Sequence, residues 1–233
     1  MILSVIIPVY NEEKTIGQVI DKVLSACLPE GFFREIIVVD DGSIDGTVTA
    51  LMQYRDHPSV QVYYSQQNNG KTAALVYGIK KAKGDYLVVQ DADLEYNPDE
   101  YWKLLGPLLK EEADAVYGSR FLGSIKNMKW INRFANNFSN MTLRALYGVN
   151  LTDVNTCYKV FKREVIKDMN ITSSGFAFET EVTVKLLKKR YKIVEVPIAY
   201  TARSRREGKK IRWASALAMY WGIIQYSMQK DDA

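Results

Sequence analysis

Histidine and cysteine are almost absent from this chain of 233 residues, and their scarcity excludes several kinds of site. The single histidine, His57, argues against a histidine-ligated zinc site and against most histidine-based catalysis. The two cysteines, Cys27 and Cys157, are too few for a disulfide scaffold or a four-cysteine metal site. Because free thiols are typical of reducing compartments, a cytoplasmic location is expected.

Long hydrophobic runs are also missing. The opening segment Met1–Pro8 is apolar, but it has no basic region and no cleavage site, so it predicts a buried strand and not a secretory signal. The apolar stretch Trp213–Met228 contains no charge, but it is shorter than the roughly 20 residues that a membrane-spanning helix needs. Since no linker interrupts the chain, we expect one domain: a main body over 1–202, and a basic loop with an amphipathic helix over 203–233.

Apolar strands alternate with helices through the first half of the chain. Strands are predicted at residues 3–8, 35–40, 60–65, 85–90 and 113–118. Helices are predicted at residues 12–27, 45–55, 71–83 and 98–112. Continuous apolar strands joined by helices predict an α/β fold, in which a mostly parallel sheet is covered by helices on both faces.

The second half is less regular. Helices are predicted at residues 130–147, 177–190 and 211–228, and strands at 158–161 and 192–200. Pro197 cannot donate a hydrogen bond to a neighbouring strand, so it predicts that the last strand lies at the edge of the sheet.

Polar residues follow each of the first five predicted strands. They lie at 10–12, 40–43, 68–71, 91–93 and 118–120. Because the carboxyl ends of parallel strands meet at one edge of a sheet, these segments predict a shared ligand crevice. The glycine patterns of dinucleotide-binding and P-loop proteins are absent, so the crevice is expected to bind a ligand in another way.

Two carboxylates, Asp91 and Asp93, come directly after the buried strand at 85–90. Carboxylates this close repel each other unless a cation lies between them. With no histidine at hand the ligands would all be oxygens, which suits Mg²⁺ or Mn²⁺, and Glu95 is a candidate third ligand.

Five segments in this order resemble the signatures of family 2 glycosyltransferases with the GT-A fold. They are Ser4–Glu12, Val38–Thr47, Asp91–Asp93, Gly118–Arg120 and Glu195–Ile198. The resemblance extends over about residues 3–212, which makes 1–202 the GT-A catalytic body. Within the family the chain is most similar to the transferases that use polyprenyl phosphates, a group that includes the dolichol-phosphate mannose synthases.

The resemblance implies a role for each matching position. The nucleoside of a GDP- or UDP-linked sugar would be held by Pro8, Tyr10, Glu12 and Asp40. The divalent metal on the diphosphate would be bound by Asp91 and Asp93, with Glu95 as a further ligand. Phosphate groups of the donor or acceptor would be faced by Arg120 and Arg133. The implied reaction is an inverting, metal-dependent transfer of a hexose to dolichyl or undecaprenyl phosphate.

The net charge is only +4, which does not predict a nucleic-acid partner, but residues 203–212 concentrate positive charge. Their cations are Arg203, Arg205, Arg206, Lys209, Lys210 and Arg212, opposed by Glu207 alone. Arg203 and Lys209 have the spacing of an Arg–Lys pair in the family, which implies a loop that grips phosphate. With the helices at 130–147 and 211–228, this segment fits either an anionic membrane surface or packing against the sheet, a second copy or a membrane partner.

The acceptor decides whether a general base is needed. A phosphate acceptor is ionised at neutral pH, whereas a saccharide hydroxyl needs a base, and relatives that use one place an acid where Glu179 and Glu181 lie. Two other functions stay open: a transferase that extends a glycan, and a non-catalytic module that binds nucleotide sugars. A nucleotidyltransferase is disfavoured, because its first loop would be glycine-rich and basic.

Overall fold

The computed structural model describes residues 1–175, 177–203 and 213–229. The basic segment after Arg203, including Lys209, lies outside them. A seven-stranded sheet crosses the described part of the molecule in the order β3-β2-β1-β4-β6-β5-β7. The strands are β1 (Ile2–Val9), β2 (Phe33–Asp40), β3 (Val60–Tyr64), β4 (Tyr86–Val89), β5 (Ala115–Lys126), β6 (Lys159–Lys162) and β7 (Ile193–Thr201).

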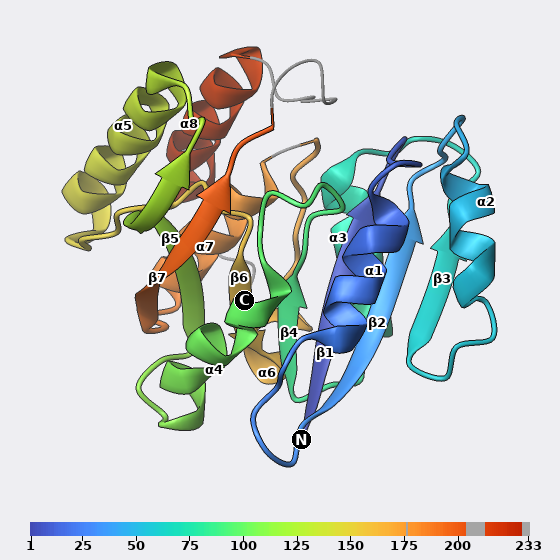
Figure 1. The fold of residues 1–233 in the computed structure, drawn as a ribbon. Coiled ribbons are helices and arrows are strands. Elements are labelled where there is room, and N and C mark those ends of the chain that lie inside the picture. The colour runs from blue at the N-terminus through green and yellow to red at the C-terminus, as the bar shows by residue number, and fades with distance from the viewer. Residues whose placement is uncertain (176, 204–212, 230–233) are drawn as a thin grey trace.

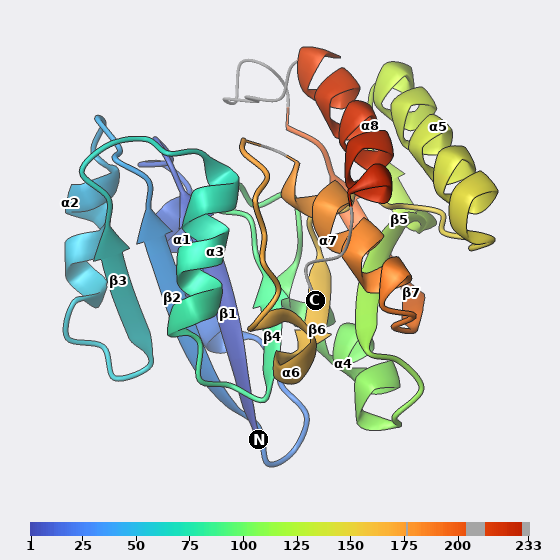
Figure 2. The ribbon, with the colours of Figure 1, turned by 180° about the vertical axis from the view of Figure 1, so that it is seen from behind.

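The helices pack on both faces of this sheet (Figures 1 and 2). One face carries α1 (Ile16–Ser25), α2 (Thr47–Leu51) and α4 (Tyr101–Leu109). The other face carries α3 (Lys71–Lys81), α6 (Arg163–Ile166) and α7 (Phe178–Lys188). Each layer buries its own apolar cluster against the sheet, which is the arrangement that continuous apolar strands predict.

The sheet is parallel except at one strand. β1, β2, β3 and β4 run parallel to their neighbours, and β5 pairs in parallel with β7. Between these groups β6 runs antiparallel to both β4 and β5. The residues that precede β6 therefore lie at the same edge of the sheet as the residues that follow the parallel strands.

Two predictions about individual strands have different outcomes. β7, which contains Pro197, is the edge strand expected from the sequence. The prediction that Gly118–Arg120 follow the fifth strand is wrong, because β5 continues to Lys126. Its pairing with β7 is interrupted between Ser119 and Ser124, so the strand changes register where it passes the site.

A third cluster lies beyond the sheet, where α8 (Trp213–Met228) packs against both α7 and α5 (Trp130–Tyr147) (Figures 1 and 2). Leu143, Val184 and Ile223 are buried between the three helices, and the rings of Phe138 and Tyr220 lie 4.5 Å apart. Over the described parts of the chain, no helix has both the length and the apolar character needed to cross a bilayer.

Candidate active site

The carboxylate pair lies in a tight turn after β4. Asp91 and Asp93 are largely buried, with 17% of each side chain exposed. Leu94 has φ of 62°, and the backbone N–H of Glu95 donates to Asp93 at 3.1 Å. The turn therefore brings the two carboxylates to the carboxyl edge of the sheet, as the sequence predicts.

A lysine that the sequence analysis did not assign lies against Asp91. The Nζ of Lys71, at the start of α3, is 2.8 Å from Asp91 Oδ1 and 3.1 Å from Glu179 Oε1. It also lies 3.0 Å from the sulfur of Cys157. Burial alone would lower the pKa of Lys71, but the neighbouring Asp91, Cys157 and Glu179 raise it well above its usual value, so the side chain is an ammonium.

A second cation, Arg203, contacts Asp93 and the loop after β1. Its guanidinium binds both carboxylate oxygens of Glu12, at 2.9 and 3.1 Å, and Asp93 Oδ2 at 3.0 Å. Only 14% of the Arg203 side chain is exposed. Each carboxylate of the Asp91–Asp93 pair thus contacts its own cation, Lys71 from α3 or Arg203 after β7.

The two carboxylates differ in their tendency to ionise. Burial, together with the nearby charges of Asp91 and Glu95, raises the pKa of Asp93 to about 7, and Arg203 only partly opposes this rise. Burial acts the same way on Asp91, but Lys71 and Arg203 hold the pKa of Asp91 below its ordinary value. The negative charges around Asp93 therefore outweigh the positive charge of Arg203, and a further cation would stabilise the ionised carboxylate.

The donor set suits a hard divalent cation. Asp91 and Asp93 offer carboxylate oxygens and no soft ligand, as Mg²⁺ and Mn²⁺ prefer. Within the described residues, no three His, Cys, Asp or Glu side chains converge into a complete ligand set. A metal held here by the two aspartates would take its other ligands from water or from the phosphates of a bound molecule.

Glu95 joins the turn to the edge strand. One of its carboxylate oxygens accepts from the backbone N–H of Arg203 at 2.6 Å, and the other accepts from the hydroxyl of Tyr200. Tyr200 in turn lies under the guanidinium of Arg120, 5.0 Å from the ring centre. Through these two hydrogen bonds Glu95 holds the end of β7 beside Asp93, and this fixes the position of the Arg203 backbone.

Arg120 is held in place by a buried acid. Its Nε and Nη2 each donate to Asp153 at 2.7 Å, and its backbone N–H donates to the same carboxylate at 2.9 Å. Asp153 is fully buried, and its loop is held by Glu195, which accepts from the N–H groups of Thr152 and Asp153. Arg120, in β5, is thus positioned by a carboxylate on the segment that precedes β6.

The predicted nucleoside residues lie at the carboxyl ends of β1 and β2 and in the loop after β1, and hydrogen bonds join the loops that follow these two strands. Asn11 has a backbone φ of 50°. Its side-chain oxygen accepts from the N–H of Ile44, and Ser43 Oγ accepts from the N–H of Asn11. Asp40 in turn accepts from the N–H and hydroxyl of Ser43. Pro8 is buried in β1, Tyr10 and Glu12 follow in the next loop, and Glu12 contacts Arg203. The role of these residues toward a nucleoside remains a prediction.

The two candidate bases face different surroundings. Glu179 contacts Lys71 and is 2% exposed. Glu181 accepts from the N–H groups of Thr172 and Ser173 and from Lys185, so both its oxygens hold the loop before α7. Of the pair, the structure brings Glu179 to the carboxylate cluster and places Glu181 in the loop contact.

Among the described residues, Arg133 forms no hydrogen bond or ion pair with this cluster. It is exposed in the first turn of α5, and its guanidinium lies 5.7 Å from the ring centre of Phe121. The predicted role of Arg133 toward a phosphate remains a prediction.

A further buried cation, Lys159, lies beneath the site on β6. Its Nζ donates to the carbonyl of Val154 at 2.9 Å and lies 3.5 Å from the ring centre of Tyr117. Burial lowers the pKa of Lys159 to about 8, against the opposite effect of Glu179 and Asp153. Lys159, Asp153 and Cys157 have no assigned role in the sequence-based prediction, because they lie at or before the start of an antiparallel strand, whereas the predicted crevice residues follow parallel ones.

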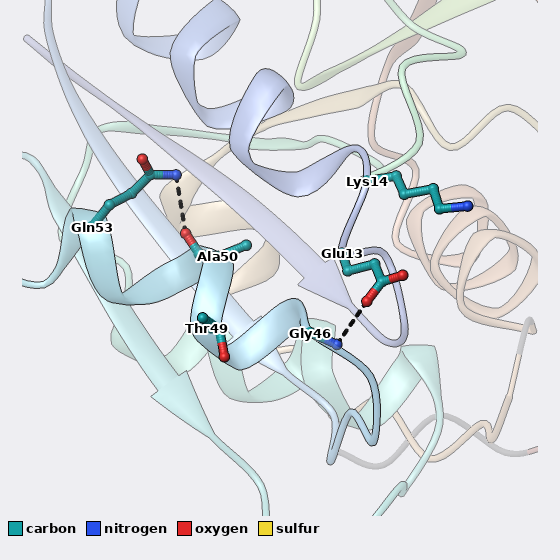
Figure 3. A pocket seen from close by; sticks show the side chains of 6 residues that line it. All are labelled: Glu13, Lys14, Gly46, Thr49, Ala50 and Gln53. Carbon is teal, nitrogen blue, oxygen red and sulfur yellow. Dashed lines mark hydrogen bonds between the residues drawn. The ribbon is translucent and has the colours of Figure 1, made fainter.

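A shallow hollow on the flank of the molecule is separate from the carboxylate cluster. It lies between the loop before α1 and helix α2 (Figure 3). Glu13 accepts from the N–H of Gly46 at 2.9 Å across it, and it is otherwise lined by Lys14, Thr49, Ala50 and Gln53. None of the acids around Lys71 and Arg203 lines this hollow, so we do not place the reaction there.

The arrangement of sheet and helices is that of a GT-A fold glycosyltransferase. Glucosyl-3-phosphoglycerate synthase from Mycobacterium tuberculosis, solved in complex with Mn²⁺, uridine diphosphate and phosphoglyceric acid, superposes with a TM-score of 0.74. The two chains are 22% identical, and the match covers 98% of this chain and 79% of the other. The model of glycosyl transferase family 2 matches residues 4–169, and the chain belongs to that family.

Two curated relatives share more sequence. The polyprenol monophosphomannose synthase of Mycolicibacterium smegmatis is 32% identical over 94% of this chain and 86% of its own length. A dolichol-phosphate mannosyltransferase of Pyrococcus furiosus is 31% identical over 90% of this chain, which spans only 59% of that relative. The chain is therefore a glycosyltransferase whose relatives include polyprenyl-phosphate sugar transferases.

Proposed function

We propose that this glycosyltransferase moves a hexose from a nucleoside diphosphate sugar to a polyprenyl phosphate at a membrane surface, with inversion and with a divalent metal. One observation carries the proposal: Asp91 and Asp93 are buried side by side after β4, each paired with a cation, Lys71 or Arg203. The carboxylates of such a site suit a metal ion, and the cations suit the diphosphate that the metal would accompany. The names of the relatives support the polyprenyl-phosphate acceptor.

On the donor side, each residue has a defined task. The loop from Tyr10 to Glu12 and the loop around Asp40 would enclose the nucleoside, since their mutual hydrogen bonds already shape one surface. Asp91 and Asp93 would hold Mg²⁺ or Mn²⁺, which stabilises negative charge on the departing diphosphate. The GT-A neighbour solved with Mn²⁺ and uridine diphosphate supports a divalent metal.

On the acceptor side, Arg203 lies beside Asp93, where the diphosphate leaves. A guanidinium can orient a phosphate with two parallel hydrogen bonds. A phosphate monoester is already ionised at neutral pH, so its oxygen attacks the anomeric carbon without giving a proton to a base. Attack from the side opposite the diphosphate inverts that carbon. A saccharide acceptor would instead need a base. Of the two candidates, Glu181 has both oxygens engaged by the loop before α7, and Glu179 is paired with the Lys71 ammonium.

The outer face of α5 supports contact with a lipid surface. It exposes a set of large apolar side chains: Trp130, Ile131, Phe134, Phe138 and Met141. From Ala115 to Thr152 the sequence has no Asp or Glu, but contains Lys126, Lys129, Arg133 and Arg144. Apolar side chains flanked by cations suit an anionic bilayer, where the acceptor phosphate lies.

A transfer assay tests the proposal. The protein is incubated with UDP- and GDP-linked hexoses, each with undecaprenyl phosphate, dolichyl phosphate or a saccharide, in Mn²⁺, Mg²⁺ or EDTA. We expect product only with a polyprenyl phosphate and a divalent metal, and mass spectrometry identifies it. Product with the saccharide alone would favour the glycan-extending alternative, and binding of donor without any transfer would favour the non-catalytic module.

A further inference from the structure

One carboxylate oxygen in the site has no hydrogen-bond partner among the residues that the structure describes. Glu179, in the first turn of α7, is 2% exposed, and its Oε1 accepts from Lys71 at 3.1 Å. Its Oε2 is buried and receives no hydrogen bond from any residue that the structure describes. Buried polar atoms are nearly always paired in native proteins, so an unpaired one in a reaction site indicates a group that meets its partner in the ligand.

The position of Glu179 relative to Asp91 indicates which part of the ligand it meets. Lys71 Nζ lies between them, 2.8 Å from Asp91 Oδ1 and 3.1 Å from Glu179 Oε1. Asp91 is proposed to hold the metal on the diphosphate. The donor hexose is bonded directly to that diphosphate, so the sugar ring is the part of the donor near enough to reach Glu179.

We infer that Glu179 Oε2 accepts a hydrogen bond from a hydroxyl group of the donor hexose, and that Lys71 is the positioning residue that keeps the carboxylate turned toward it. This inference rests on the proposed function. A carboxylate accepts hydrogen bonds, so it recognises an O–H group and not an ether or a methyl group. A donor without that hydroxyl would leave a buried charge unpaired, and sites built to bind a hydroxyl strongly reject such analogues.

Glu181 provides a matched control two residues further along α7. Its carboxylate has the same chemistry, but its oxygens are occupied by the N–H groups of Thr172 and Ser173 and by Lys185. Loss of its charge should weaken the loop before α7 without changing the recognition of the sugar.

The test compares two ligands in binding calorimetry with Mn²⁺: the nucleoside diphosphate hexose that the transfer assay selects, and the same nucleoside diphosphate without sugar. In Glu179→Ala we expect affinity for the sugar nucleotide to fall about 10–100-fold, the range for a hydrogen bond to a charged group. Affinity for the plain diphosphate should stay within about twofold. Glu179→Gln, which keeps one acceptor oxygen, should show a smaller loss and serves if the alanine variant does not fold.

Monodeoxy donors identify the hydroxyl. One of them should bind equally well to the wild type and to Glu179→Ala, because the contact is already missing. Glu181→Gln should have a lower melting temperature and an unchanged ratio between the two affinities. Equal losses for both ligands in Glu179→Ala, or a fall in kcat with unchanged donor affinity, would overturn the inference and leave the proposed function standing. A wild type that binds no nucleotide sugar would overturn both.

Discussion

The guanidinium of Arg203 binds both carboxylate oxygens of Glu12, at 2.9 and 3.1 Å. Glu12 belongs to the loop after β1, and Arg203 follows the edge strand β7. This contact links the loop that is proposed to face the nucleoside to the arginine that is proposed to face the acceptor. It also holds the guanidinium against Asp93, where a phosphate is expected.

Replacing Arg203 by lysine should lower kcat/KM about 10–100-fold, because an ammonium cannot form the paired hydrogen bonds to Glu12. Glu12→Gln should show a loss of similar size. If the two residues act as a unit, the double variant will be little worse than either single one. Arg190→Lys, an exposed arginine after α7, is the control and should match the wild type. Additive losses in the double variant would show that the two side chains act independently.

Mn²⁺ should raise the melting temperature of the wild type and not that of Asp91→Asn or Asp93→Asn, because binding to the native state alone stabilises it. Both variants should fold but lose about a thousandfold in transfer, the loss expected when the charge on the leaving diphosphate is no longer balanced. Asp99→Asn, an exposed acid near the same turn, should keep both responses. Full transfer by the two site variants in EDTA would exclude the metal.

Lys159 should make stability depend on pH. Its pKa of about 8 in the folded protein lies below the ordinary lysine value, so between these values the unfolded chain binds more protons than the native one. Stability therefore rises as pH increases through this window. The Lys159→Met variant cannot titrate at this position and serves as the reference. Relative to it, the free energy of unfolding of the wild type, measured in denaturant titrations, should increase by about 2 kcal/mol between pH 7 and 9.5. Parallel curves for the two proteins would show that the ammonium is not penalised by burial.

The exposed face of α5 should carry binding to lipid. Trp130→Ser combined with Phe134→Ser should lower binding to anionic vesicles at least about tenfold, since each side chain contributes roughly 1.5–3 kcal/mol when buried. Phe33→Ser is the matched control, because Phe33 is also an exposed aromatic residue but is the first residue of β2. β2 and α5 lie on opposite sides of the molecule (Figure 1). Cosedimentation with vesicles measures the effect. Equal binding by all three proteins would remove α5 from the membrane contact.

The parallel part of the sheet could be predicted from the sequence, and with it one edge of the site. Asp91 and Asp93 follow a buried parallel strand, so the topology alone places them at the carboxyl edge. β6 reverses this rule. β6 has only four residues, and nothing in so short a segment indicates that it runs antiparallel to its neighbours. The segment before it, with Asp153 and Cys157, was therefore not recognised as part of the site.

The direction in which the side chains of α7 point could not be predicted from the sequence either. Glu179 and Glu181 both lie in the first turn of that helix, and the sequence gives no reason to prefer one. Two residues along a helix are separated by about 200° around its axis, so the two acids must face different neighbours. Which of them faces Lys71 depends on how α7 rotates when its apolar face packs on the sheet, and only the tertiary structure shows that rotation.

The pairing of Glu12 with Arg203 also has a consequence for the order of events during synthesis. The two residues are separated by 191 positions. A nascent chain that ends at Ala202 already contains every strand of the described sheet and both aspartates of the site, yet it lacks the guanidinium that joins the two halves. The strands of the sheet can thus be synthesised before the site is electrostatically complete, and the cation that contacts Asp93 and Glu12 is added only after β7.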